Sequence, residues 1–262
     1  MPDAAIRILE TIPWTPGCEG SFPGERRFIE LGEAKVPMVF CWCPPSSETA
    51  GLGGFWIAQH PVNQAQWMAV MGGNPSRKSK GDLFPVDSVS WDDAQKFCRN
   101  GQLRLPSEAE WEYACRAGTT GEFGVGMGEA LNSQRANFDG NFPYGSGHKV
   151  FQWVYWKTTV EQGCYPPNMW GLHDMHGQLW EWCEDEVGGR ARVLRGGSCL
   201  NNGVNARSCS RNRNAPDNRP ENFGFRPRPS STQEGSEPEA RGSRGARQGG
   251  ARDERPTASR RG

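Results

Sequence analysis

Apolar residues along this chain occur in short runs, and polar or Gly- and Pro-rich segments separate the runs. Residues 36–40 (VPMVF) and 55–58 (FWIA) are continuous apolar runs, which predicts two short strands. Pro44 follows the first run closely and Pro61 follows the second, so we expect both strands to end there. The ordered part of the chain is therefore expected to begin near residue 36.

Three short helices are predicted from polar capping residues that precede helical spacing. Asn63 caps a helix over residues 64–71, and Gly72 ends it. Ser90, followed by two Asp residues, begins a second helix. Ser107 begins a third, in which Glu110 completes a capping box.

The most polar stretch of the chain is residues 195–226, which contains seven Asn. Asn is a poor former of helix and strand because its amide competes for the backbone, so we expect an irregular loop. Apolar residues at 193–195 and 223–225 predict a strand at each end. A polar loop anchored on a rigid frame is a common way to build a binding site.

Composition favours a loop-rich α+β or β protein. Only 35% of residues are hydrophobic, and 11 Trp and 12 Phe must supply much of the core. The 34 Gly and 20 Pro indicate many turns. Three Trp between residues 170 and 182 predict a buried aromatic knot, and residues 119–167 read as a long structured loop. Residues 1–35 form a lead-in arm or strand in this interpretation, residues 36–229 the domain, and residues 230–262 a disordered low-complexity tail.

Charge and cysteine content exclude several classes of protein. The net charge is zero, which gives no reason to expect nucleic acid as the partner. The chain has no apolar run that could span a membrane and no recognisable signal peptide, so a cytoplasmic location is the default, with surface display by another route left open. The nine Cys contain no CxxC pair. Buried free thiols are expected, with a disulfide or a metal site as the alternatives.

A series of short motifs runs through the chain in a fixed order. The motifs are residues 55–63 followed by Gln66-Trp67, residues 85–91 (PVDSVSW), 103–112 (LRLPSEAEWE), 168–175 (NMWGLHDM) with 180–182 (WEW), 195–198 (RGGS) and 224–226 (GFR). Together they resemble the formylglycine-generating-enzyme (sulfatase-modifying factor) family, a branch of the C-type lectin fold. The resemblance covers residues 36–228. It implies an α+β fold of short strands and about three short helices with long structured loops.

Within that family, the Asn-rich stretch resembles the variable proteins of diversity-generating retroelements. Those systems mutate adenines of a template, which turns Asn codons into codons for many other residues but never into stop codons. The resemblance implies a non-catalytic binding protein with a macromolecular ligand, in the first place a protein, and a carbohydrate as the milder variant. The resemblance does not decide whether the four Arg at 207, 211, 213 and 219 belong to the frame or contact the ligand. The implied contact positions are Cys199, Leu200, Asn201, Asn202, Val204, Asn205, Ser210, Asn212, Asn214, Ala215, Asn218, Pro220, Glu221, Asn222 and Phe223.

Two catalytic readings of the same family compete with binding. The founding enzymes use two Cys to bind copper and oxidise a protein cysteine, and soft thiolates suit that ion. Alignment from residues 224–226 backwards places those two positions on Gly203 and Ser208, so no catalytic cofactor is expected. A shifted pair of cysteines, Cys199 and Cys209, is the alternative. The related iron-dependent sulfoxide synthases need three His, and the four His here (60, 148, 173 and 176) are interpreted as structural.

A structural calcium is the remaining cofactor that the resemblance implies. The matching positions are Asp174, Gly177, Leu179 and Glu181, and oxygen ligands from a loop suit this hard ion. Gln178 departs from the Asn that is usual in the family. The alternative is that Asp174 and Glu181 only cap the local backbone.

Overall fold

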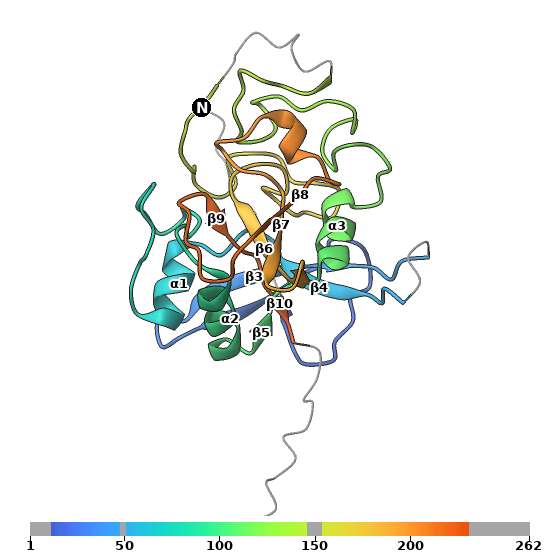
Figure 1. Cartoon of the computed structure of the whole chain (residues 1–262). Helices are drawn as coiled ribbons and strands as arrows, with labels where there is room; N and C mark the ends of the chain where they lie inside the picture. Colours follow the sequence, from blue (N-terminus) through green and yellow to red (C-terminus); the bar gives the residue numbers. More distant parts are fainter. Residues whose placement is uncertain (1–11, 48–50, 146–153, 231–262) are drawn as a thin grey trace, which may run out of the picture. The chain divides into compact units, whose positions relative to one another are not determined.

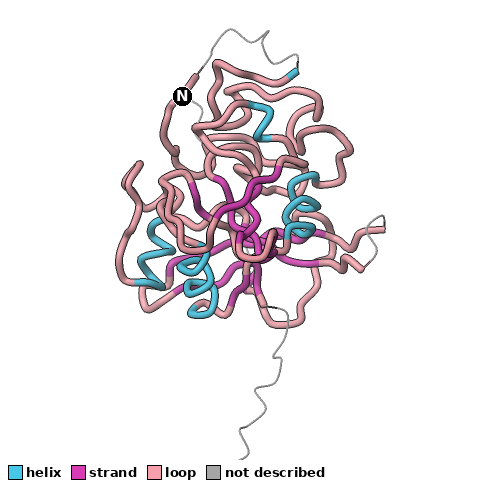
Figure 2. Tube along the Cα trace, viewed as in Figure 1, coloured by secondary structure: helices cyan, strands magenta, loops and turns pink. Residues whose placement is uncertain are grey.

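The computed structural model describes residues 12–47, 51–145 and 154–230 (Figure 1). The predicted disordered tail, residues 230–262, lies outside the described residues except for Ser230, and His148 also lies outside them. Strands gather at the centre of the molecule, and long loops make up the region beyond them (Figure 2). Among the helices in the described ranges, none has the length and hydrophobicity that crossing a membrane requires.

The first sheet is built by the amino-terminal third of the chain. Its order is β1-β2-β3-β4, formed by β1 (Ile12–Pro13), β2 (Arg26–Leu31), β3 (Val36–Cys43) and β4 (Phe55–Ala58). β1 pairs with β2 in parallel, and the other two pairs are antiparallel. β1 and β2 precede residue 36 and belong to the same sheet as β3.

The second sheet carries the polar stretch. Its order is β8-β7-β6-β9, formed by β6 (Trp180–Val187), β7 (Ala191–Arg195), β8 (Arg211–Asn214) and β9 (Phe223–Gly224). A small third sheet pairs β5 (Leu103–Arg104) with β10 (Arg228–Pro229). The two predicted strands that flank the polar stretch are therefore β7 and β9, which lie on either side of β6.

The three helices begin where their capping residues predict. They are α1 (Gln64–Met71), α2 (Trp91–Asn100) and α3 (Glu108–Arg116). Asn63, Ser90 and Ser107 each accept a hydrogen bond from the backbone of the third helical residue, whose side chain bonds back to the cap. Figure 1 places α1 and α2 beside each other at one end of the central strands and α3 beside β7.

Aromatic rings fill the core, as the composition predicts. Trp67, Phe97 and Phe225 pack at centroid distances of 5.3–6.1 Å. Trp180 and Trp182 belong to this same cluster, whereas Trp170 packs in a second one with Trp111. The three Trp at 170–182 are thus all buried but do not form a single knot.

The expectation of an entirely irregular polar stretch is wrong at two places. Residues 203–206 form a short 3₁₀ turn, and residues 211–214 (RNRN) form β8, which pairs antiparallel with β7. Asn and Arg have low strand propensity, but pairing with an already formed strand overrides that preference.

Candidate functional site

The polar stretch is fixed at its start by Arg195, a buried arginine with 1% of its surface exposed. Its Nη2 donates to the Glu112 carboxylate at 2.5 Å and to the Ser208 carbonyl at 2.7 Å. Its Nη1 lies 3.3 Å from Glu108 Oε1. Both acids belong to α3, so this helix holds the beginning of the stretch, and Arg195 itself links that beginning to the middle at Ser208.

The end of the stretch is fixed by Arg226, which is 0% exposed. Its Nε and Nη2 donate to the two oxygens of Glu181 at 2.7 and 2.8 Å. Its remaining donors reach the backbone carbonyls of Ala58, Gln59 and His173. A charge this deeply buried is tolerated only when it is paired and hydrogen-bonded, as it is here. The predicted anchoring of the polar stretch at both ends is therefore confirmed, although its interior contains the 3₁₀ turn and β8.

Several Asn of the stretch hold its internal structure. Asn201 Oδ1 accepts from Trp180 Nε1 at 2.8 Å and lies 2.6 Å from Ser198 Oγ. Asn202 caps the 3₁₀ turn through the Asn205 backbone. Asn222 Nδ2 donates to Ser198 Oγ at 3.0 Å. These amides serve the fold as well as the surface.

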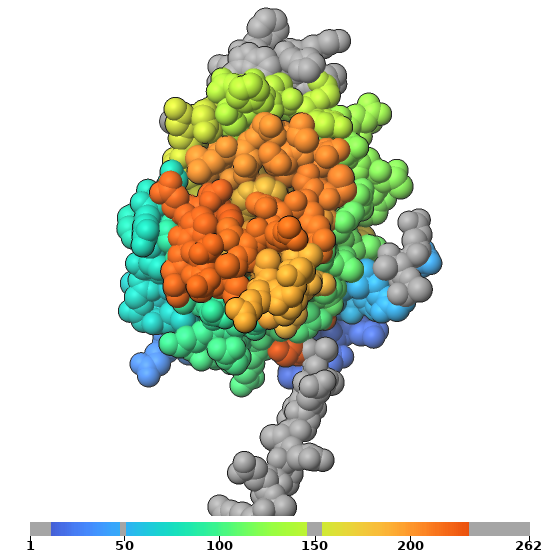
Figure 3. All heavy atoms as spheres, in the orientation of Figure 1, coloured from blue at the N-terminus to red at the C-terminus, as the bar shows by residue number. Residues whose placement is uncertain are grey.

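The remaining side chains cover one face of the molecule, where the residues around 195–226 gather (Figure 3). Two of the expected contact residues are not on that face: Cys199 is 0% exposed, and Phe223 is 4% exposed and packs against Trp182. The burial of these two residues was not visible from composition. The expected contact residues that are exposed are Asn202, Val204, Asn212, Ala215, Asn218 and Glu221, and those that are half-buried are Leu200, Asn201, Asn205, Ser210, Asn214, Pro220 and Asn222.

The arginines of the stretch fall into two kinds. Arg207, Arg211 and Arg219 each form an ion pair with an acid of the surrounding frame, namely Glu122, Glu108 and Asp93. Burial acts to raise the pKa of Asp93, but hydrogen bonds from Arg219 and Ser90 outweigh it and hold that pKa below its usual value.

Arg213 is different. It is exposed, and within the described ranges no acid lies at ion-pair distance from it. Three of the four arginines therefore tie the stretch to the frame, and Arg213 presents its charge outward.

The positions expected to match catalytic cysteines are both interior. Gly203 and Ser208 are buried, and the Ser208 hydroxyl lies 3.6 Å from the thiol of Cys115. Of the alternative pair, Cys209 is exposed, whereas burial raises the pKa of Cys199 to about 12. Burial of Cys199 therefore disfavours its thiolate form, and it keeps this thiol apart from the exposed Cys209.

The three described His have structural partners. The rings of His60 and His173 stack at 4.4 Å, and burial together with His60 lowers the pKa of His173 to about 4. His176 is buried, which lowers its pKa to about 4, and it binds the Ala206 carbonyl and the Gly124 backbone. In the part of the chain that the structure describes, no three His, Cys, Asp or Glu side chains converge as a metal site.

Of the four positions expected to hold calcium, the two acidic side chains have partners within the protein. Both oxygens of Glu181 already accept from Arg226, and Trp111 Nε1 donates to one of them at 2.7 Å. Asp174 has a free oxygen, Oδ2, which lies 3.7 Å from His60 Nδ1. The side chain of Gln178 between them bonds the Val160 backbone through both its oxygen and its nitrogen. The ion stays a prediction, which we test below.

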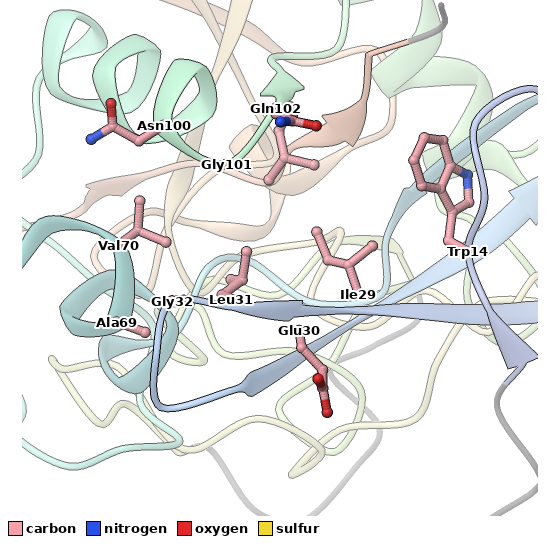
Figure 4. Close-up of a pocket in the computed structure, with 11 residues that line it drawn as sticks. Trp14, Ile29, Glu30, Leu31, Gly32, Ala69, Val70, Asn100, Gly101 and Gln102 are labelled. Atoms are coloured by element: carbon pink, nitrogen blue, oxygen red, sulfur yellow. The ribbon is translucent and has the colours of Figure 1, made fainter.

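A separate pocket of about 400 Å³ lies away from the polar stretch, between β2, α1 and the turn from α2 to β5. Ile29 and Leu31 point into it, and Glu30 points away (Figure 4). The pocket shares no residue with the segment 195–226. With an apolar floor and no inward-pointing titratable side chain, it offers no catalytic chemistry.

Comparison with known proteins identifies relatives of two kinds, named as inactive C-alpha-formylglycine-generating enzymes and as formylglycine-generating enzymes. The sulfatase-modifying factor enzyme 1-like domain model matches residues 25–227. The inactive C-alpha-formylglycine-generating enzyme 2 of Bos taurus is 35% identical over 182 residues, which are 66% of this chain and 58% of that protein. The formylglycine-generating enzyme of Streptomyces coelicolor is 36% identical over 200 residues, covering 66% of this chain and 60% of that protein. The chain thus spans about three fifths of the length of these curated relatives.

A solved structure confirms the predicted α+β architecture. Treponema denticola variable protein 1 superimposes with a TM-score of 0.59 and 21% identity, over 78% of this chain and 98% of that one. At this level of identity the likeness concerns the fold.

Proposed function

Because the chain belongs to the sulfatase-modifying factor family and has its C-type lectin-like fold, we propose that it is a non-catalytic binding protein whose ligand contacts the face made by residues 195–226. The observation that carries the proposal is the construction of this face. Two buried arginines, Arg195 and Arg226, hold the ends of the segment, and polar side chains between them are exposed. A fixed frame under a polar surface suits recognition by many different side chains.

The chemistry of the exposed residues supports a macromolecular ligand. Asn amides at 202, 212 and 218 supply donors and acceptors, and Val204, which is 45% exposed, supplies an apolar contact. Spread over one face, such groups fit a broad surface better than a small buried molecule. We infer a protein ligand first.

The origin of the surface is part of the same proposal. Seven Asn in one segment fit a retroelement that rewrites adenines in Asn codons, as the resemblance to variable proteins implies. A structural neighbour bears the name variable protein, which is compatible with this reading.

A copper oxidoreductase acting on a protein cysteine is the second candidate, because one relative of 36% identity is a formylglycine-generating enzyme. Burial of Cys199 and the residues Gly203 and Ser208 argue against it here.

The two functions separate in one experiment. The full chain is incubated with cuprous ion, oxygen and a peptide that contains one cysteine, and the peptide is analysed by mass spectrometry for loss of the thiol and formation of the aldehyde. We expect an unchanged peptide. Turnover that disappears in the Cys209→Ser variant would establish the oxidoreductase and overturn the proposed binding function.

A further inference from the structure

Strand β8 (Arg211–Asn214) lies at the end of its sheet and within the exposed face. It pairs with β7 on one side, and in the described residues no strand pairs with its other side (Figure 1). The free edge of a strand presents backbone N–H and C=O groups to which another extended chain can bind. β8 is therefore a candidate for pairing with a partner.

The outward backbone donors of this edge can be identified. In an antiparallel pair, successive residues alternate between bonding the partner strand and facing away from it. The N–H of Arg213 donates to the side-chain Oδ1 of Asn212 at 2.8 Å, and the N–H of Ala215 donates to Oδ1 of Asn214 at 2.8 Å. These two N–H groups are thus directed away from β7, toward the open edge.

The two Asn side chains cover this edge. Asn212 is exposed and can be displaced, whereas Asn214 is half-buried and its Oδ1 also accepts from Asn218 Nδ2 at 2.5 Å, so displacing it breaks that bond as well. A carbonyl of an incoming strand can replace a side-chain amide oxygen at the same donor, because both are amide acceptors. Both Asn also belong to the positions that the resemblance implies are diversified, so their replacement would open or close the edge.

Charge indicates what the incoming strand carries. Arg213 projects from the same strand without an acid partner in the described ranges, whereas Arg211 on β8 is held by Glu108 at 2.7 Å. A carboxylate on the ligand would give Arg213 the kind of ion pair that Glu108 gives to Arg211.

Resting on the binding function proposed above, we propose that the ligand is an extended peptide segment of a partner protein, which adds as a strand to the free edge of β8 and places a carboxylate beside Arg213. Such strand addition obtains its affinity from main-chain hydrogen bonds and its specificity from alternate side chains. Diversity at Asn212 and Asn214 would then tune access to the edge.

The test uses selected peptides as the probe. A phage-displayed library of random peptides about a dozen residues long is selected on the full chain, and the best binder is measured by calorimetry. Each backbone amide of that peptide is then N-methylated in turn. We expect losses of about tenfold or more at every second amide and little change between them, because only alternate amides bond to the edge.

Two protein variants give an independent reading. Arg213→Pro removes the outward N–H without touching the β7 ladder, and proline is tolerated at such edge positions. Arg213→Ala is the matched control, which removes the charge and keeps the N–H. We expect Arg213→Pro to bind the peptide about tenfold more weakly than Arg213→Ala. Circular dichroism and thermal unfolding check that both variants fold.

The outcomes distinguish this inference from the binding function itself. Equal binding by the two variants, or N-methyl effects without alternation, would overturn strand addition. The binding function survives that result if Val204→Ala or Asn218→Ala weakens binding of the same peptide. A selection that enriches no peptide above an unrelated control protein also overturns the peptide ligand. If Arg213→Pro does not fold, the N-methyl scan decides alone.

Discussion

Arg226 and Glu181 form an ion pair that solvent does not reach, with side chains 0% and 1% exposed. The guanidinium binds both carboxylate oxygens, and Trp111 donates to the same carboxylate. This pair fastens the last residue of the exposed segment to β6. The stability of the face made by residues 195–226 therefore depends on charges in the interior of the protein.

Replacing Arg226 with alanine is expected to lower the free energy of unfolding by about 3–5 kcal/mol, because Glu181 would remain buried without a counter-charge. Urea unfolding measures this loss. Lys35→Ala is the matched control, since the Lys35–Glu30 pair is exposed and worth about 0–1 kcal/mol. Similar losses in the two variants would contradict a larger contribution of the buried Arg226–Glu181 pair to the free energy of unfolding.

Asn201 is expected to remain Asn among variants of this protein, although it lies within residues 195–226. Its Oδ1 is the acceptor for the buried Trp180 indole, so Asn201→Ala should cost about 1–3 kcal/mol. Asn218→Ala, on the exposed surface, should change stability by less than about 0.5 kcal/mol. Thermal unfolding of the two variants compares them, and equal effects would contradict a structural role for Asn201.

Thiol reactivity should separate the cysteines by burial. Iodoacetamide at pH 8 is expected to modify the exposed Cys164 and Cys209, while Cys199 and Cys115 remain unmodified in the folded protein. Peptide mass mapping after quenching identifies the sites. Rapid labelling of Cys199 would contradict its burial and would reopen the copper reading.

The same burial gives a pH dependence of stability. Burial raises the pKa of Cys41, Cys115 and Cys199 to about 12, above the value of about 9 expected in the unfolded chain. The unfolded state therefore releases these protons first, so this stabilisation is complete below pH 9 and declines as pH rises from 9 to 12. Urea unfolding at pH 8, 9 and 10 measures the decline. In Cys199→Ala the decline should be shallower, and an identical slope would contradict the assignment.

Calcium bound at Asp174, Gly177, Leu179 and Glu181 is expected to raise the thermal stability, because an ion that binds only the folded state stabilises it. Thermal unfolding with excess calcium and with EGTA tests this. A rise of several degrees with calcium would support the ion, and loss of that rise in Asp174→Asn would locate it.

The sequence predicted the helices well and the polar segment only in outline. Asn63, Ser90 and Ser107 are local signals, so the helix starts could be read from them directly. The strand Arg211–Asn214 could not be read from the sequence, because its extended structure comes from pairing with β7 and no apolar alternation marks it.

Burial of individual residues was also hidden from sequence reasoning. Arg195 and Arg226 are of a type usually found on the surface, and only the spatial position of Glu112 and Glu181 explains their place inside. Cys199 and Phe223 were expected on the binding face because they lie within the segment, but the strand and turn geometry directs them into the core.

The proposed diversified binding function is tested most directly by sequencing the genomic DNA beside the gene. We expect a near-copy of the codons for residues 195–226 that differs from them only where the copy carries adenine, together with a reverse transcriptase gene. Codons for Arg195 and Arg226 should be identical in both copies, since these residues hold the frame. Flanking DNA with no near-copy, or with differences spread over all four bases, would contradict diversification by a retroelement.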